Sequence, residues 1–161
     1  MPSDLQLKTM NLVHRVILKA SFGKVGWEAM GMPVVELTTT GRKTGKRRSR
    51  CVRVVRRGDR AYLVAIKGVG VTGWAKNALA NPEVTLRLRD GRFTGTARKL
   101  RAEEHDDGRD AYSAGVHRFE RLEWKVWRED SFSPAKSRDL HEQWFDTGTP
   151  LVVELADANR S

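Results

Sequence analysis

A run of hydroxyl, glycine and cationic residues at positions 38–48 is the part of this sequence best suited to chemistry. Its residues are Thr-Thr-Thr-Gly-Arg-Lys-Thr-Gly-Lys-Arg-Arg. Glycines let backbone N–H groups approach an anion, and arginine can hold a phosphate or carboxylate through two parallel hydrogen bonds. The run therefore predicts a cradle for a polyanion, with a solvated basic hairpin tip as the alternative. It is not a Walker A loop, because it joins two predicted strands and opens no helix.

Two later segments could complete such a site. The first, Ala65–Gly68, ends a predicted strand, where backbone followed by glycine can lie against a flat ring and Lys67 could neutralise an anion. The second begins at Trp74 and Asn77, in a short predicted helix. For Trp74 the sequence leaves two interpretations open, a place in the core or a ring-stacking role.

Other signals of catalysis are missing from the sequence. The four histidines have no metal-ligand spacing, and neither a Gly-x-Ser-x-Gly nucleophile motif nor a Gly-x-Gly-x-x-Gly dinucleotide fingerprint is present. A reaction carried by a bound redox cofactor fits this pattern best, because the protein then supplies position and electrostatics.

The composition also favours an anionic partner. In 161 residues, 30 Lys and Arg face 20 Asp and Glu, for a net charge of +10. A phosphorylated small molecule, an anionic membrane surface or a merely solvated surface would fit this charge. We expect no nucleic-acid partner, since aromatic residues are not interleaved with Arg42–Arg57 as a base-stacking platform requires. The single cysteine, Cys51, excludes an internal disulfide and fits a cytoplasmic protein.

The elements that must position these residues are mostly strands. Alternating or continuous apolar runs predict about six strands, and Gly58-Asp59 and Asp90-Gly91 are typical of tight hairpins. The third strand is almost entirely apolar, so we expect it to be central. The predicted strands are Val34–Thr40, Lys46–Val55, Arg60–Ile66, Glu83–Leu88, Arg92–Leu100 and Pro150–Leu155.

Predicted helices lie mainly before and between these strands. The ranges are an N-terminal helix at 3–22, then Trp74–Leu79, Ala102–Trp127 and Ala135–Phe145. Hairpins with segregated helices indicate an α+β fold, an antiparallel sheet or small barrel, as one domain over 1–161. The N-terminal helix would pack on the sheet or lie on a membrane surface. No stretch is apolar enough to span a bilayer.

The order and spacing of these motifs resemble the deazaflavin-dependent nitroreductase family of actinobacteria. The resemblance rests on Thr39–Gly45, Ala65–Gly68, Trp74–Val84 and Pro150–Leu155, and it extends from about Val34 to Leu100 together with the last strand. It implies a split β-barrel that binds coenzyme F420, a 5-deazaflavin carrying a phosphate and a polyglutamate tail. It also implies hydride transfer from the reduced cofactor to quinones, nitro compounds or unsaturated lactones.

The resemblance further implies a set of cofactor-binding residues by position. These are Arg42, Lys43, Thr44, Gly45, Arg48, Ala65, Ile66, Lys67, Gly68, Trp74 and Asn77. The first five would hold the phosphate and tail, and the last two would begin a helix beside the cofactor. Ala65, Lys67 and Gly68 would border the deazaflavin ring, with Ile66 at a position near the reactive ring. At position 66 relatives usually carry serine.

The leading hypothesis is an F420-dependent oxidoreductase that reduces a hydrophobic acceptor such as a quinone or nitro compound. The acceptor pocket would be roofed by the N-terminal helix and the Tyr112–Trp127 segment. No catalytic acid or metal is assigned, Tyr112 being only a guess at the acid. The alternative is a non-enzymatic deazaflavin- or fatty-acid-binding protein of the same fold. We expect a cytoplasmic monomer or homodimer, with peripheral contact at the inner face of the cell membrane left open.

Overall fold

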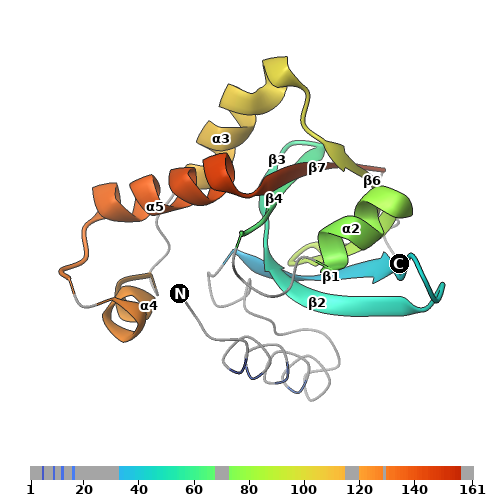
Figure 1. Ribbon diagram of the computed structural model, residues 1–161, viewed down its shortest axis with the longest axis horizontal. Helices are drawn as coiled ribbons and strands as arrows, with labels where there is room; N and C mark the ends of the chain where they lie inside the picture. Colours follow the sequence, from blue (N-terminus) through green and yellow to red (C-terminus); the bar gives the residue numbers. More distant parts are fainter. Residues whose placement is uncertain are drawn as a thin grey trace.

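Seven antiparallel strands form one curled sheet, a half-open barrel, in the computed structural model (Figure 1). The strands are β1 (Val34–Thr40), β2 (Arg47–Arg53), β3 (Val55–Arg57), β4 (Arg60–Ala65), β5 (Glu83–Leu88), β6 (Gly91–Lys99) and β7 (Thr149–Leu155). Their order in the sheet is β2-β1-β5-β6-β7-β4-β3. The structure describes residues 33–67, 73–114, 120–128 and 130–156, together with Leu5, Thr9, Leu12 and Val16.

The predicted hairpins are confirmed. β1 pairs with β2 from Val34↔Arg53 to Thr40↔Arg47, and the basic turn at 41–46 joins them. Gly58 and Gly91 have positive φ values of 65° and 146° in the two tight turns, conformations that favour glycine.

The predicted strand Lys46–Val55 is two strands in the structure. Val54 separates β2 from β3, and its N–H donates to Pro33 O at 2.8 Å. Its side chain is buried in the inner core, whereas Val55 packs against the outer cluster. The chain therefore changes partners at Val54, from β1 to β4, which a continuous β-rich sequence does not reveal.

The inner core fills the concave side of the sheet. Alternate residues of β1, β5 and β6 point inward, and helix α2 (Gly73–Ala80) adds Trp74, Ala75 and Ala78 to the same cluster. Figure 1 shows α2 lying within the curve of the sheet, beside β1 and β6. This placement brings α2 against the end of the basic turn.

The outer face of β4 and β7 is covered by α3 (His105–Ser113) and α5 (Pro134–Thr147), with η2 (Ala102–Glu104) leading into α3. Helix α4 (Glu120–Trp127) lies farther from the sheet (Figure 1). Tyr62, Val64 and Val152 pack there against Tyr112 and Phe145. β4 is consequently buried on both faces, but the expectation that it is central is wrong, because only the short β3 separates it from the sheet edge. The outer helices cover its second face, and this accounts for the continuous apolar run.

The single helix predicted over Ala102–Trp127 is wrong. Ala114 adopts an extended conformation, with φ −68° and ψ 135°, and ends α3 before α4 begins at Glu120. The apolar periodicity continues through this region because both helices bury a face, so periodicity alone could not locate the break.

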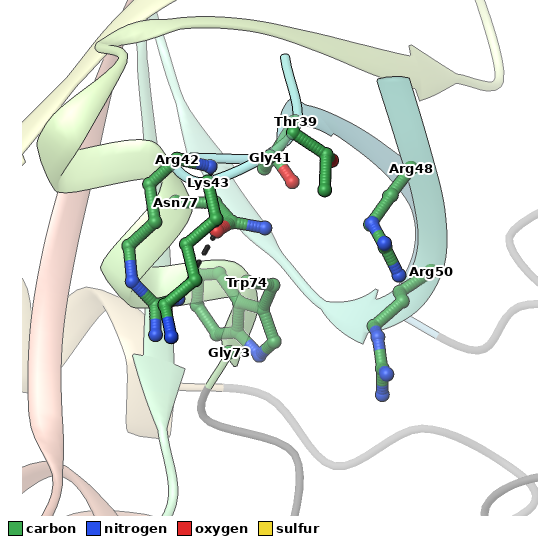
Figure 2. Close-up of a pocket in the computed structure, with 10 residues that line it drawn as sticks. Thr39, Gly41, Arg42, Lys43, Arg48, Arg50, Gly73, Trp74 and Asn77 are labelled. Carbon is green, nitrogen blue, oxygen red and sulfur yellow. Dashed lines mark hydrogen bonds between the residues drawn. The ribbon is translucent and has the colours of Figure 1, made fainter. Parts of the chain in front are cut away.

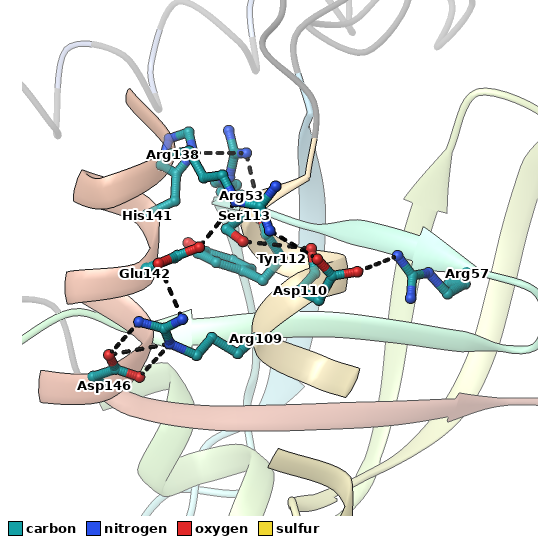
Figure 3. A network of polar contacts seen from close by, with 10 residues as sticks. All are labelled: Arg53, Arg57, Arg109, Asp110, Tyr112, Ser113, Arg138, His141, Glu142 and Asp146. Atoms are coloured by element: carbon teal, nitrogen blue, oxygen red, sulfur yellow. Dashed lines mark hydrogen bonds and ion pairs between the residues drawn. The ribbon is translucent and has the colours of Figure 1, made fainter. Parts of the chain in front are cut away.

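Charged side chains fasten α3 to α5 (Figure 3). Arg109 contacts Asp146 at 2.9 Å and Glu142 at 3.0 Å. Arg138 contacts Glu142 and, across to α3, Asp110, both at 2.9 Å. Such exposed pairs contribute little singly, but together they fix the register of the two helices.

The N-terminal helix predicted at 3–22 lies largely outside the described residues. Leu5, Thr9, Leu12 and Val16 are helical. Among the described residues, no helix has both the length and the apolar character that crossing a bilayer requires.

Candidate functional site

A cationic pocket of about 260 Å³ opens between the basic turn, β2 and α2 (Figure 2). Its described lining contains four cations and no acidic residue. The lining residues are Thr39, Gly41, Arg42, Lys43, Thr44, Arg48, Arg50, Gly73, Trp74 and Asn77. Six of them belong to the predicted cofactor-binding set, and the structure brings these six together from three elements.

The turn is closed by its own backbone. Gly41 N donates to Lys46 O at 2.9 Å, and Gly45 N donates to Gly41 O at 2.8 Å. A methyl group at Gly41 would lie 3.0 Å from Thr44 Oγ1 and 3.2 Å from Lys46 O, so glycine permits this tight closure. Gly45 itself has a φ of 65° and shapes the turn, but it does not line the pocket.

Arg48 and Arg50 form one wall of the pocket, and Arg42 and Lys43 form the opposite one (Figure 2). The strand alternates its side chains, so residues 48 and 50 of β2 share a face. Sequence reasoning selected Arg48 and missed Arg50, although the same alternation would have found it. It also missed Thr39, Gly41 and Gly73 as lining residues.

Trp74 and Asn77 form the floor. Trp74 is 7% exposed and belongs to the inner core, yet it also lines the pocket, so its two proposed roles coexist. Asn77 Oδ1 accepts hydrogen bonds from Arg42 N and Arg42 Nη1, both at 3.2 Å. The indole therefore offers a flat surface at the base of a pocket whose walls are charged.

The residues predicted to border a ring are not part of this lining. Ala65 is buried in the inner core, Ile66 packs against the outer cluster, and Lys67 is exposed. Gly68 lies outside the described residues. Their assignment to the cofactor stays a prediction.

Tyr112 does not roof the pocket. It is 0% exposed, packed in the outer cluster, with the Arg53 guanidinium 5.3 Å from its ring centre (Figure 3). Burial raises the pKa of its hydroxyl to about 12, although the charge of Arg53 opposes the shift. A phenol enclosed in this way cannot donate a proton to a ligand in the pocket, so the guess that Tyr112 is the catalytic acid is wrong.

A second polar cluster lies under the outer helices. His141 Nε2 lies 3.0 Å from Glu120 Oε1, and Ser137 Oγ donates to the same carboxylate. Arg53 Nη2 donates to His141 Nδ1 at 3.4 Å and to Tyr112 O at 3.3 Å. A guanidinium can only donate, so Nδ1 must be the acceptor and Nε2 carries the proton shared with Glu120. This buried cluster joins β2, α3, α4 and α5.

The donor set of the pocket suits a polyanionic cofactor with a flat ring system. Arginines on both walls can hold phosphate or carboxylate oxygens. No carboxylate among the described lining residues opposes an anion.

Comparisons with known proteins agree with this chemistry. The family model described as F420H(2)-dependent quinone reductase matches residues 11–121, more than half of the chain. An F420H(2)-dependent quinone reductase of Mycobacterium tuberculosis (strain ATCC 25618 / H37Rv) is 33% identical over 100 residues, which cover 60% of this chain and 67% of that protein.

Solved structures share the fold. One described as an F420-H2 dependent reductase (FDR-A) is 26% identical, with a TM-score of 0.50, over 76% of this chain and 94% of its own. Another, described as a domain-swapped dimer, is 25% identical, with a TM-score of 0.50, over 76% of this chain and 80% of its own. The predicted α+β split barrel is thus confirmed, and a deazaflavin cofactor is confirmed at the level of the family. The chain belongs to the F420H(2)-dependent quinone reductase family.

Proposed function

We propose that this protein is a reductase that uses reduced coenzyme F420 to reduce a hydrophobic acceptor, a quinone or a nitro compound. Family membership supports the cofactor. The quinone acceptor is an extension from the names of relatives, and the nitro acceptor is what the family resemblance implies. One observation carries the proposal: four cationic side chains surround Trp74 in a single pocket, and no acidic residue is among the described residues that line it. When bound, the reduced deazaflavin supplies a hydride.

The residues of the pocket would bind and orient that cofactor. Arg42 and Lys43 on the turn, with Arg48 on β2, would hold phosphate and tail oxygens. Trp74 would limit how deeply the flat part of the cofactor enters. Each fixed Arg–phosphate or Arg–carboxylate contact contributes about 1.5–3 kcal/mol of binding free energy. Ala65 to Gly68 would border the ring, as the family resemblance implies.

The test is a titration with oxidised and reduced F420, with flavin mononucleotide for comparison, followed by F420H2 oxidation with menadione as acceptor. Selective binding with turnover is the expected result. Selective binding without turnover would favour the carrier alternative. Salt-sensitive binding to random DNA without F420 binding would overturn the proposal and revive a nucleic-acid partner.

We also propose peripheral contact with an anionic membrane, at the inner face of the cell membrane. Leu5, Leu12 and Val16 are 74%, 61% and 58% exposed, and their spacing places them on one helical face. Thr9 lies between them, and its hydroxyl donates to Leu5 O at 2.9 Å. The net charge of +10 would favour anionic lipid.

The membrane proposal is tested by replacing all three apolar residues with serine. Co-sedimentation with phosphatidylglycerol vesicles should fall in the variant, while neutral phosphatidylcholine vesicles should bind neither protein well. Equal sedimentation of the variant and the natural chain with anionic vesicles would remove the proposal.

A further inference from the structure

Two asparagines tie this end of the β1–β2 hairpin to α2. Asn77, within the helix, contacts Arg42 in the basic turn, and Asn81, which directly follows the helix, contacts Thr40 at the end of β1. Asn77 is 8% exposed, and its Oδ1 accepts hydrogen bonds from both the backbone N–H and the guanidinium of Arg42. Both groups are donors only, so the amide oxygen must face Arg42 and the amide NH2 must point away from it. Figure 2 shows this nitrogen turned toward the space between the two walls.

Asn81 makes the second contact, outside the pocket lining. Its Nδ2 donates to Thr40 O at 3.3 Å, at the last residue of β1 before the turn. A carbonyl can only accept, so this amide orientation is fixed as well. The backbone N–H of Asn81 already continues the helix by donating to Asn77 O at 2.8 Å. The side-chain amide of Asn81 reaches the strand.

These contacts set where the turn stands. The β1–β2 ladder runs to Thr40↔Arg47, and the Gly41 N–H continues it by donating to Lys46 O, so the base of the turn is fixed relative to β2. These bonds do not hold the turn to α2. Arg42, Lys43 and Thr44 are exposed, so packing holds them weakly. The position of Arg42 relative to α2 and the pocket floor then depends on the two asparagines. A polyanion gains most from cations whose positions are set before it binds.

We infer that Asn81 is a positioning residue for the anion pocket, acting with Asn77 to hold the cationic turn against α2. Asn81 does this without touching the ligand. The inference rests on the proposed function only for the identity of the natural ligand, F420. The position of the turn would affect the binding of any polyanion that contacts both walls.

The test measures the dissociation constants of F420 and, separately, of inorganic pyrophosphate by calorimetry. Asn81→Ala should weaken both about threefold to tenfold, the effect of losing one hydrogen bond. Asn81→Gln, which keeps the amide, should recover part of the loss. Gln143→Ala, an amide removed from an exposed site on α5, is the matched control and should change neither constant. Chemical denaturation of each variant separates affinity from stability.

A double-mutant cycle with Arg42→Ala shows whether Asn81 acts through the turn. In the Arg42→Ala background, Asn81→Ala should weaken pyrophosphate binding less than about twofold, because its effect is transmitted through the missing cation. A full, additive loss in that background would reduce Asn81 to a general structural role and overturn the inference.

The two ligands separate this inference from the proposed function. Suppose that the protein does not bind F420 but that Asn81→Ala weakens pyrophosphate binding. This result would overturn the proposed cofactor and support the positioning role of Asn81 and Asn77. Unchanged pyrophosphate affinity in Asn81→Ala would overturn the positioning role even if F420 binds tightly. Failure of the natural chain to bind pyrophosphate would also overturn it.

Discussion

At the scale of single residues, Arg50 adds a cation to the wall that already holds Arg48. Arg50→Ala should weaken F420 binding about tenfold, because one charge-assisted contact is lost. Arg47→Ala is the matched control on the same strand, since Arg47 points to the other face and donates to Thr85 Oγ1 at 2.9 Å. Equal losses in the two variants, measured by calorimetry, would mean that only overall charge matters.

Tyr112 illustrates a residue whose burial removes it from chemistry. Tyr112→Phe should leave F420H2 turnover and its pH profile unchanged, because the hydroxyl lies on the far side of the sheet from the pocket. Tyr112→Ala should instead cost about 3–5 kcal/mol of unfolding free energy, since it leaves a cavity in the outer cluster. Urea denaturation checks the second statement, and a changed pH profile in Tyr112→Phe would contradict the first.

At the scale of elements, β6 and β7 approach closely at Gly95. A methyl group there would lie 2.6 Å from Val153 Cγ1 and 2.7 Å from the backbone oxygen of Glu154. Because the β7 backbone cannot move aside locally, Gly95→Ala should cost about 1–3 kcal/mol. Gly73→Ala is the control, as a methyl there meets nothing within 4 Å and α2 tolerates alanine. Similar midpoints for the two variants in urea would refute this account of the sheet.

The acidic residues that join elements make stability depend on pH. Burial raises the pKa of the Glu120 carboxyl, but hydrogen bonds from His141 and Ser137 outweigh this effect and bring the pKa down to about 2. Hydrogen bonds from the Arg98 side chain and the Arg101 backbone lower the pKa of Glu104 to about 2. Both ordinarily titrate near 4.5, so their stabilisation is complete above that pH and is lost as pH falls toward 2.

Thermal unfolding between pH 7 and pH 2.5 should follow this direction. The midpoint should stay level down to about pH 5 and fall steeply below it. Glu120→Gln should lose about 2–4 kcal/mol at pH 7, because a buried charged partner is removed, and should show a shallower acid decline. If the unfolding midpoint of Glu120→Gln fell as steeply with acid as that of the natural chain, Glu120 would be excluded as a cause of the pH dependence.

At the scale of the whole molecule, local sequence signals predicted most of the sheet. Local patterns predicted the hairpin turns at Gly58 and Asp90-Gly91 and the strand Glu83–Leu88 with its alternation. These patterns depend only on neighbouring residues, so the sequence alone contains them. The break at Val54 depends on a tertiary contact, the hydrogen bond from its N–H to Pro33 O. The apolar periodicity of the sequence does not indicate such a contact, nor does it mark the end of α3 at Ala114.

The residues of the candidate site were likewise predictable only in part. The turn and Arg48 were predictable because glycines and cations stand together in the sequence. Which side of the sheet Ile66 or Tyr112 faces was not, because that depends on where the strands and later helices pack. Ile66 packs outward with Val64, a contact that the sequence motif does not indicate, and its place beside the ring stays a prediction.

The central claim is that the cationic turn and β2 hold F420 together. The most direct measurement is the dissociation constant of F420 for the natural chain and for Arg42→Ala combined with Lys43→Ala. Lys46→Ala with Lys76→Ala is the control, because it removes the same charge from exposed positions outside the pocket lining. The account predicts about 100-fold weaker binding in the first pair and little change in the second. Unchanged affinity after loss of Arg42 and Lys43 would contradict it.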